Sequence, residues 1–79
     1  MRALTLYHRE GCHLCEAMER ELLPLLAAHG WRLERVDVDS DPGLAARYGL
    51  DVPVLAHDGR ELCRHRLDRA AVEALLERP

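Results

Sequence analysis

The 79-residue sequence predicts one α/β domain with a four-stranded mixed sheet and three helices, in the order β-α-β-α-β-β-α. Three observations support this fold class. Short apolar runs typical of strands alternate with segments whose apolar residues recur at helical spacing. An Asp-Gly pair late in the chain indicates a tight hairpin, which makes the last two strands antiparallel. The chain is too short for a second domain and contains no linker or repeat, so we expect residues 1–79 to form a single domain.

The first half of the chain predicts a strand, a helix and a second strand. Residues 3–7 are a mostly apolar run with β-forming side chains. Leucine and methionine residues then recur every three or four positions from His13 onward, which predicts a helix that ends at Gly30, a residue suited to a left-handed cap. Residues 31–38 alternate as the second strand, and a change in the parity of their apolar residues predicts a bulge or a strand end near residues 34–35. Because a crossover helix joins the two strands, they should be parallel.

The second half predicts a helix, two strands and a last helix. Asp41 is followed by proline, which suits a helix start, because aspartate caps the first turn and proline fits its first position. Residues 52–56 form the third strand, and the turn at residues 58–59 pairs it with a fourth strand at residues 61–66. Asp68 caps the last helix. The buried stripe of that helix should comprise Ala71, Val72, Leu75 and Leu76.

Composition and charge exclude several classes of function. The chain has 11 basic and 14 acidic residues and a formal net charge of −3, which argues against nucleic acid as its main partner. No apolar stretch approaches the length of a membrane span, about 18 residues or more. No signal-peptide pattern opens the chain. We therefore expect a cytoplasmic monomer that binds neither nucleic acid nor membrane.

Three cysteines carry the strongest chemical signal. The cytosol keeps thiols reduced, and an odd number cannot pair completely, so a disulfide scaffold is not expected. Cys12 and Cys15 form a CxxC motif where the first strand leads into the first helix. A thiol at a helix start faces unpaired amide donors and the positive end of the helix dipole, which favour the reactive thiolate. We expect Cys12 to attack a disulfide and Cys15, almost one turn further on, to resolve the intermediate.

Four segments carry a resemblance to a known family: residues 6–7, residues 9–15 with the run Arg-Glu-Gly-Cys-His-Leu-Cys, residues 51–53 with Asp-Val-Pro, and the turn at residues 58–59. Over essentially its whole length the sequence resembles the glutaredoxin and thioredoxin superfamily, and most of all the short bacterial glutaredoxin-like proteins. The resemblance implies a thioredoxin-like fold of the glutaredoxin type and a redox-active disulfide that serves electron transport and cell redox homeostasis. It also implies a cis bond at Pro53, beside the redox pair, and pairing of the Val52 backbone with the substrate chain.

The function expected from these residues is thiol–disulfide exchange with disulfide-containing protein substrates. The predicted catalytic residues are Cys12 and Cys15. The predicted substrate-binding residues are Arg9, His13, Val52 and Pro53. We expect no bound cofactor, and the reducing equivalents must come from glutathione or from a thioredoxin-reductase-type flavoprotein.

Three departures from the family pattern affect what can be expected of the redox potential and of the reductant. Glutaredoxins usually carry a proline and an aromatic residue between the cysteines, whereas this chain has His13 and Leu14, so the family's redox potential does not transfer. Thioredoxins usually place a buried acid in the strand before the motif, and here Leu6 and its neighbours supply none. Glutathione-using glutaredoxins have a paired-glycine turn after strand four, where this chain has Arg-His-Arg-Leu-Asp at residues 64–68. We therefore expect glutathione to be a poor reductant.

A different class of function stays open from the residues alone. The same fold can serve as a non-catalytic binding or metal-carrying module with Cys12 and Cys15 as ligands. Cys63 and His65 alternate onto one face of the fourth strand and would complete a four-ligand set. A long gap separates the two pairs, whereas structural zinc sites usually place their ligand pairs closer, so we expect no metal. Cys63 by itself is expected to be a small buried hydrophobe.

Overall fold

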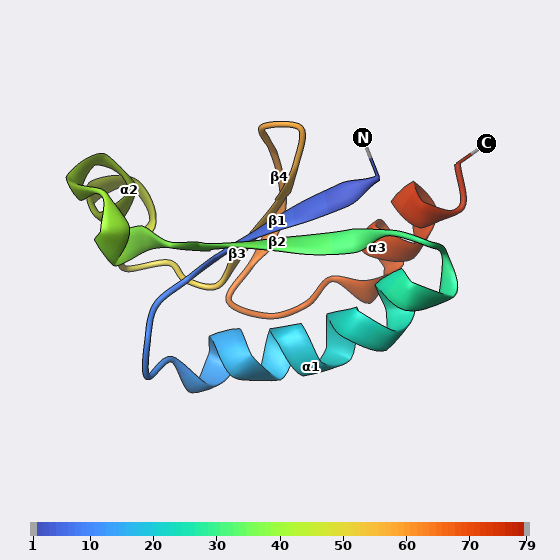
Figure 1. Cartoon of the computed structure of the whole chain (residues 1–79), viewed down its shortest axis with the longest axis horizontal. Coiled ribbons are helices and arrows are strands. Elements are labelled where there is room, and N and C mark those ends of the chain that lie inside the picture. The colour runs from blue at the N-terminus through green and yellow to red at the C-terminus, as the bar shows by residue number, and fades with distance from the viewer. Residues whose placement is uncertain (1, 79) are drawn as a thin grey trace.

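Within the described residues, 2–78, four strands form one mixed sheet and three helices pack around it (Figure 1). In this computed structural model the strands are β1 (Ala3–His8), β2 (Arg32–Asp37), β3 (Val54–His57) and β4 (Arg60–Arg64). The helices are α1 (His13–Ala28), α2 (Pro42–Tyr48) and α3 (Arg69–Leu76), with a 3₁₀ turn, η1 (Val38–Ser40), before α2. The predicted order β-α-β-α-β-β-α is confirmed.

The sheet has the strand order β2-β1-β3-β4. β1 and β2 are parallel, as expected for strands joined by the crossover helix α1, while β3 is antiparallel to both β1 and β4. β1 and β4 therefore run in the same direction, and their C-terminal ends lie at one end of the sheet. The β3–β4 hairpin turns at Asp58 and Gly59, whose φ angles of 48° and 80° are of the kind that a two-residue primed turn requires.

The predicted bulge or strand end near residues 34–35 is wrong. All six residues of β2 pair with β1 in unbroken register, and the irregular register of this sheet lies between β3 and β4. The change in parity has another cause, because Leu33 packs against the core while Val36 pairs with Tyr7 on the opposite face. The Tyr7 ring stacks on Tyr48 of α2 with 4.4 Å between ring centroids, so apolar groups cover both faces of β2 along different parts of its length.

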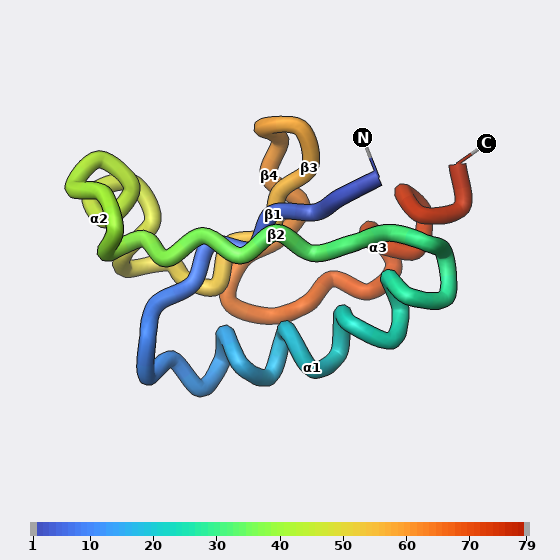
Figure 2. The backbone as a smooth tube through the Cα atoms, in the orientation of Figure 1, coloured from blue at the N-terminus to red at the C-terminus, as the bar shows by residue number. Residues whose placement is uncertain are grey.

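One face of the sheet carries the hydrophobic core. Figure 2 shows α1 running along the sheet and α2 lying beyond the end of β2. The core residues are Leu4 and Leu6 of β1, Met18, Leu22, Leu25 and Leu26 of α1, Leu55 of β3, and Val72, Leu75 and Leu76 of α3. The predicted stripe of α3 is confirmed, except that Ala71 is only half-buried. Burial of this one cluster therefore fixes both α1 and α3 against the central strands.

The helix ends follow their sequence signals. Gly30 takes φ 71°, and the N–H of Trp31 donates to the carbonyl of Leu26 at 3.0 Å, which closes the end of α1. Trp31 then packs, partly buried, against the core at the end of α1 opposite the cysteines. Asp41 and Asp68 cap α2 and α3, each accepting an N–H from the residue three positions later at 3.1 Å. Among residues 2–78 no helix is both long and apolar enough to cross a lipid bilayer.

Replacing Leu22 with alanine should destabilise the protein by about 2–5 kcal/mol, the usual cost of truncating a leucine in a core. Leu22 has no exposed surface and lies in the cluster that joins α1 to the sheet. Leu23 is 48% exposed, so Leu23→Ala is the matched control and should change the free energy of unfolding by no more than about 0.5 kcal/mol. Urea titration of both variants measures the difference. Equal losses in the two would contradict the packing of α1.

Candidate redox site

Cys12 occupies the start of α1, where the CxxC spacing predicts it. The chain leaves β1 through a short loop in which Gly11 has φ 75°, a left-handed conformation that glycine adopts readily. Cys12 then takes extended backbone angles, φ −94° and ψ 104°, as the N-cap of α1. Its Sγ accepts the N–H of Cys15 at 3.1 Å. The sulfur of Cys12 therefore receives an amide donor at the positive end of the helix dipole.

Cys12 and Cys15 are joined by a disulfide, with 5.2 Å between their Cα atoms. The two cysteines differ in exposure, since Cys12 is half-buried and Cys15 is only 4% exposed. The difference follows from the helix, because the N-cap lies outside the first turn, whereas Cys15 begins the buried stripe that continues with Met18 and Leu22. Cys12 is therefore the member of the pair that a disulfide of another molecule reaches first.

Pro53 lies at the same end of the sheet as the redox pair. The Val52–Pro53 peptide bond is cis, as the family resemblance implies. Val54, the first residue of β3, pairs with Tyr7 near the end of β1, and from there the chain continues to Cys12. Pro53 is buried and Val52 is half-buried immediately before the ladder of β3 begins. The topology therefore brings the cis-proline loop and the start of α1 to one end of the sheet.

Side chains from the end of β4 hold the loop before β3. Arg64 Nη1 lies 3.0 Å from Oδ2 of Asp51, while Nε and Nη2 donate to Glu61 at 2.7 and 2.6 Å. His65 Nε2 lies 3.4 Å from Oδ1 of Asp51, and the His65 N–H donates to the carbonyl of Pro53 at 2.8 Å. The hydrogen bonds that Arg64 donates to Glu61 raise the pKa of Arg64 and lower the pKa of Glu61. This end of β4 therefore anchors the cis-proline loop, a role that the sequence alone did not indicate.

Two of the predicted substrate-binding residues, Arg9 and His13, occupy different surroundings. Arg9 donates from Nε and Nη2 to the two carboxylate oxygens of Asp39, at 2.9 Å each, and from Nη1 to the carbonyl of Gly49 at 2.9 Å. The hydrogen bond lowers the pKa of Asp39 and ties the loop before α1 to η1 and to the end of α2. His13 is 97% exposed, with Nδ1 3.6 Å from Oε2 of Glu16. Arg9 is therefore engaged by contacts with Asp39 and Gly49, while His13 lies exposed at the surface next to the N-cap.

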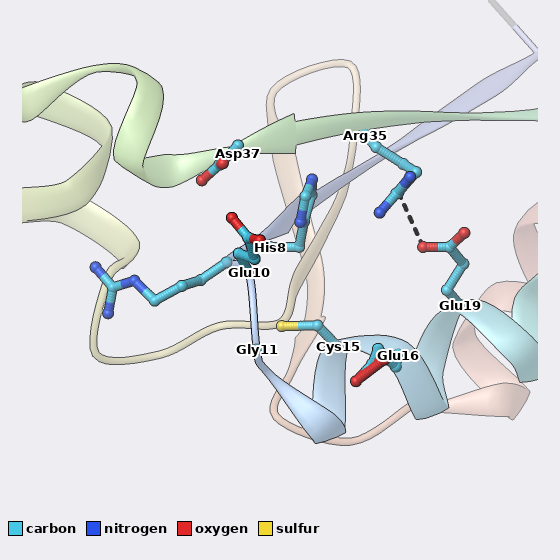
Figure 3. A pocket seen from close by; sticks show the side chains of 9 residues that line it. His8, Glu10, Gly11, Cys15, Glu16, Glu19, Arg35 and Asp37 are labelled. Atoms are coloured by element: carbon cyan, nitrogen blue, oxygen red, sulfur yellow. Dashed lines mark ion pairs between the residues drawn. The ribbon is translucent and has the colours of Figure 1, made fainter.

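A cleft of about 350 Å³ opens beside the redox pair, between the end of β1, the first turns of α1 and the end of β2 (Figure 3). In Figure 3 the ring of His8 points from the end of β1 towards β2, and the sulfur of Cys15 points from α1 towards the loop at Gly11; both residues line the cleft. The lining residues are His8, Arg9, Glu10 and Gly11 at the end of β1 and in the following loop, Cys15, Glu16 and Glu19 on α1, and Arg35 and Asp37 on β2. No sequence motif indicates a role for Glu19, Arg35 or Asp37, because only the β1–β2 register and the packing of α1 bring them to the redox pair.

The four-ligand metal set is not assembled. In the part of the chain that the structure describes, no group of three or more His, Cys, Asp or Glu side chains is placed to hold a metal ion. Cys63 is a free thiol on β4, separated from β1 by β3, and it packs half-buried against the core. Burial raises the pKa of the Cys63 thiol, which disfavours the reactive thiolate. Cys63 therefore fits the small hydrophobe predicted for it.

Comparison with known proteins identifies the family. A family model described as "Glutaredoxin-like domain (DUF836)" matches residues 3–77. The protein belongs to this glutaredoxin-like family. The solution structure of protein Ne2328 from Nitrosomonas europaea is similar to it, with 38% identity and a TM-score of 0.82 over 94% of this chain and 89% of that chain. Protein XcR50 from X. campestris has 40% identity and a TM-score of 0.70 over 96% of this chain and 99% of that chain.

The wider superfamily is visible in the fold. Thioredoxin 1 from Thermosipho africanus superposes with a TM-score of 0.63 at 19% identity, over 95% of this chain and 94% of that chain. The resemblance to the glutaredoxin and thioredoxin superfamily, and the thioredoxin-like fold it implies, are therefore confirmed.

In this glutaredoxin-like protein, Asp39→Asn should lower stability at neutral pH and have little effect in acid. Arg9 holds the pKa of the folded-state Asp39 carboxyl below its ordinary value of 3.8, so the charged pair stabilises the fold above that pH. The contribution is lost as the pH falls through the folded-state pKa. Urea midpoints of the two proteins should therefore converge below about pH 3.

The matched control for this prediction is Asp41→Asn. Asparagine also caps helices, so the N-cap of α2 should survive and the loss at neutral pH should be smaller than for Asp39→Asn. If the urea midpoints of the wild type and Asp39→Asn differed as much in acid as at neutral pH, the ionic role of the Arg9–Asp39 pair would be contradicted.

Proposed function

We propose that this protein is a thiol–disulfide oxidoreductase that exchanges disulfides with protein substrates through Cys12 and Cys15. The observation that carries the proposal is a disulfide between a half-buried N-cap cysteine and a buried cysteine of the first helical turn. The family match and the thioredoxin-like fold support the same chemistry. The proposal includes no bound cofactor, because the pair of thiols carries both electrons.

Cys12 is the attacking thiol of the reduced protein. An N–H directed at its sulfur from Cys15, at 3.1 Å, and the partial positive charge at the start of α1 both stabilise a thiolate. The Cys12 thiolate attacks one sulfur of the substrate disulfide and forms a mixed disulfide with it. The S–S bond of the substrate breaks, and the other substrate sulfur leaves as a thiolate.

Cys15 completes the exchange. Its thiol loses a proton, attacks the Cys12 sulfur of the mixed disulfide and releases the second substrate thiolate. Two electrons have then passed to the substrate, and the Cys12–Cys15 disulfide has formed. The Cα separation of 5.2 Å is within the usual range for a disulfide, so the ring closes without a large backbone movement.

The substrate chain binds along the cis-proline loop. Val52 precedes the ladder of β3, so its backbone N–H and C=O lie outside the strand pairing. An extended peptide can hydrogen-bond to such groups as an added strand does. The contacts of Arg64 and His65 with this loop hold its shape before the substrate arrives, which reduces the ordering cost of binding. Val52 and Pro53 are thus the substrate contacts of the proposal, with His13 exposed at the edge of the same site.

The two motif thiols should differ in reactivity. Iodoacetamide at neutral pH should modify Cys12 of the reduced protein before Cys15, because Cys12 is more exposed and lies at the helix start. Cys15→Ser should accumulate mixed disulfides with a disulfide-containing protein such as insulin, because the resolving thiol is gone. Cys12→Ser should lose exchange altogether. Peptide mass spectrometry locates the modified thiols and the trapped bonds.

The matched control is Cys63→Ala. It removes the third thiol, which packs against the core on β4, and should keep the exchange rate with a stability loss of about 1 kcal/mol. Equal alkylation rates at Cys12 and Cys15, or a loss of exchange in a folded Cys63→Ala variant, would overturn the assignment of roles.

A thioredoxin-reductase-type flavoprotein fits the site better than glutathione as the source of electrons. Glutathione carries two carboxylates and needs backbone amides or small residues near the second cysteine. Here Arg66, Leu67 and Asp68 occupy the turn after β4, and Asp68 adds a negative charge. Arg64 is already bound by two carboxylates, those of Glu61 and Asp51, which reduces its attraction for a third. The proposal places the reaction in the cytoplasm, where such reductases keep thiols reduced.

Reduction of the Cys12–Cys15 disulfide should therefore be slow with glutathione and glutathione reductase, and fast with thioredoxin reductase and NADPH. The two time courses are followed by NADPH absorbance on the same oxidised protein. A variant that replaces Arg66 and Leu67 with glycine restores small residues at the turn and should gain activity with glutathione. Rapid, saturable turnover of the unaltered protein with glutathione would show that the turn does not exclude it.

A further inference from the structure

The cleft in Figure 3 has no part in the exchange described so far, although Cys15 lines it. A buried thiol must lose its proton before it attacks, and burial disfavours the thiolate. We propose that His8 is the general base that accepts the Cys15 proton in the resolving step. The inference rests on the proposed function and deepens it, because it assigns the proton of the second half-reaction.

The geometry of β1 brings His8 to Cys15. Leu4 and Leu6 point into the core that α1 covers, and neither has exposed surface. His8 lies two residues further along the strand, so its side chain is on the same face but opposite the first turn of α1. Cys15 is the buried residue of that turn. Both residues line one cleft of about 350 Å³, which has room for a bridging water between the ring and the thiol.

The arginines of the cleft do not compete for this role. A guanidinium is always protonated and accepts no proton. Each is also bound to a carboxylate, since Arg9 Nε lies 2.9 Å from Asp39 and Arg35 Nε lies 2.9 Å from Glu19. The dashed line in Figure 3 marks the second of these pairs. The two ion pairs also withdraw Glu19 and Asp39 as proton acceptors.

The remaining acids of the cleft are poorer acceptors than an imidazole. Carboxylates have ordinary pKa values near 4, whereas histidine is the side chain suited to exchange a proton near neutral pH. Glu10 and Glu16 are exposed, and Asp37 accepts the N–H of Asp39 on Oδ1 at 2.9 Å. Among residues 2–78 no hydrogen bond or ion pair engages the ring of His8. The ring is therefore available to the thiol.

Asp37 gives the protonated ring a counter-charge. It is the cross-strand partner of His8 in the parallel β1–β2 ladder, and the two side chains lie on the same face of the sheet. Its Oδ1 is fixed by the start of η1, so the carboxylate is held beside the strand end. The carboxylate makes no hydrogen bond to the ring, so it supplies a nearby negative charge but does not orient the imidazole.

The proposed step balances protons and electrons. The Cys15 thiol gives its proton to a ring nitrogen of His8, directly or through one water. The Cys15 thiolate forms a bond with the Cys12 sulfur, the bond from Cys12 to the substrate sulfur breaks, and its electron pair leaves with the substrate. The protonated ring then returns its proton to the substrate thiolate or to solvent. The substrate disulfide is the only oxidant required.

A chromogenic disulfide separates the two half-reactions. One equivalent of dithiobis-nitrobenzoate, mixed with reduced protein in a Cys63→Ala background, releases one coloured thiol when Cys12 attacks and a second when Cys15 resolves. We expect His8→Gln to change the rate of the first phase by no more than about twofold. The rate of the second phase should fall by about 100-fold at neutral pH, which is the lower range of general-base effects. His29→Gln, at the far end of α1 beside the carbonyl of Leu25, is the matched control and should keep both phases.

The pH profile distinguishes a base from a packing residue. With His8 present, the second-phase rate should rise as imidazole loses its proton and then level off. In His8→Gln the rate should keep rising until the thiol ionises unaided, so the two proteins converge at alkaline pH. In a second variant, His8→Ala, added imidazole should restore the second phase in proportion to its free-base concentration.

An unchanged second phase and pH profile in His8→Gln would overturn this inference and leave the proposed function intact. A slowed second phase that keeps the original pH profile and does not respond to imidazole would also overturn it, because His8 would then act through packing. Absence of the first phase in the protein with His8 intact would overturn the proposed function, and this inference with it.

Discussion

Leu4 and Leu6 of β1 share one buried cluster with Met18 and Leu22 of α1, and this contact fixes the helix lengthwise on the strand. Because α1 cannot slide along β1, its first turn stays opposite the point where β1 ends. The N-cap Cys12, the buried Cys15 and the cis-proline loop all take their places from that junction. The thiol pair is thus positioned by apolar packing in the middle of the domain, while the loop that carries Cys12 only has to close a short gap.

Arginines hold the loops at this end of the molecule. Arg9 joins the loop before α1 to Asp39 and to the carbonyl of Gly49, and Arg64 joins the cis-proline loop to β4. A guanidinium suits this use because its planar fork donates to two or three oxygens at once. A Cβ at Gly49 would lie 2.9 Å from Arg9 Nη2 and closer still to the carbonyl oxygen of Ala45, so glycine leaves room for both groups. Two arginines near the site, Arg9 and Arg64, therefore link segments that are distant in sequence.

Local sequence signals predicted most of the fold and the core of the site. Caps, a hairpin turn and a CxxC motif each depend on a few adjacent residues, so they could be recognised without knowledge of the fold. The bulge or strand end predicted near residues 34–35 is absent, because parity shows which side chains are apolar but not which face of an edge strand is covered. The contacts of Arg64 and the cleft near His8 depend on strand register and on helix packing, which no short motif encodes.

The conformation of the turn after β4 likewise depends on tertiary contacts and not on a local sequence signal. His65 adopts φ 68°, a left-handed conformation more typical of glycine, in the turn where glutathione-using glutaredoxins have a glycine pair. Its N–H donates to the carbonyl of Pro53, and its ring approaches Asp51. One left-handed residue is thus present in this turn without glycine, held by tertiary contacts that the residue types did not reveal.

Trp31, the single tryptophan, gives the molecule an optical property that follows from its position. It lies just past the C-terminal end of α1, a helix of 16 residues and thus about 24 Å long, whereas the disulfide lies at the other end. The indole packs against the core and is too far from the sulfurs to be quenched by contact with them. Its fluorescence should therefore change when the domain unfolds but not when the disulfide opens. Thiol chemistry and unfolding can then be observed separately in one sample.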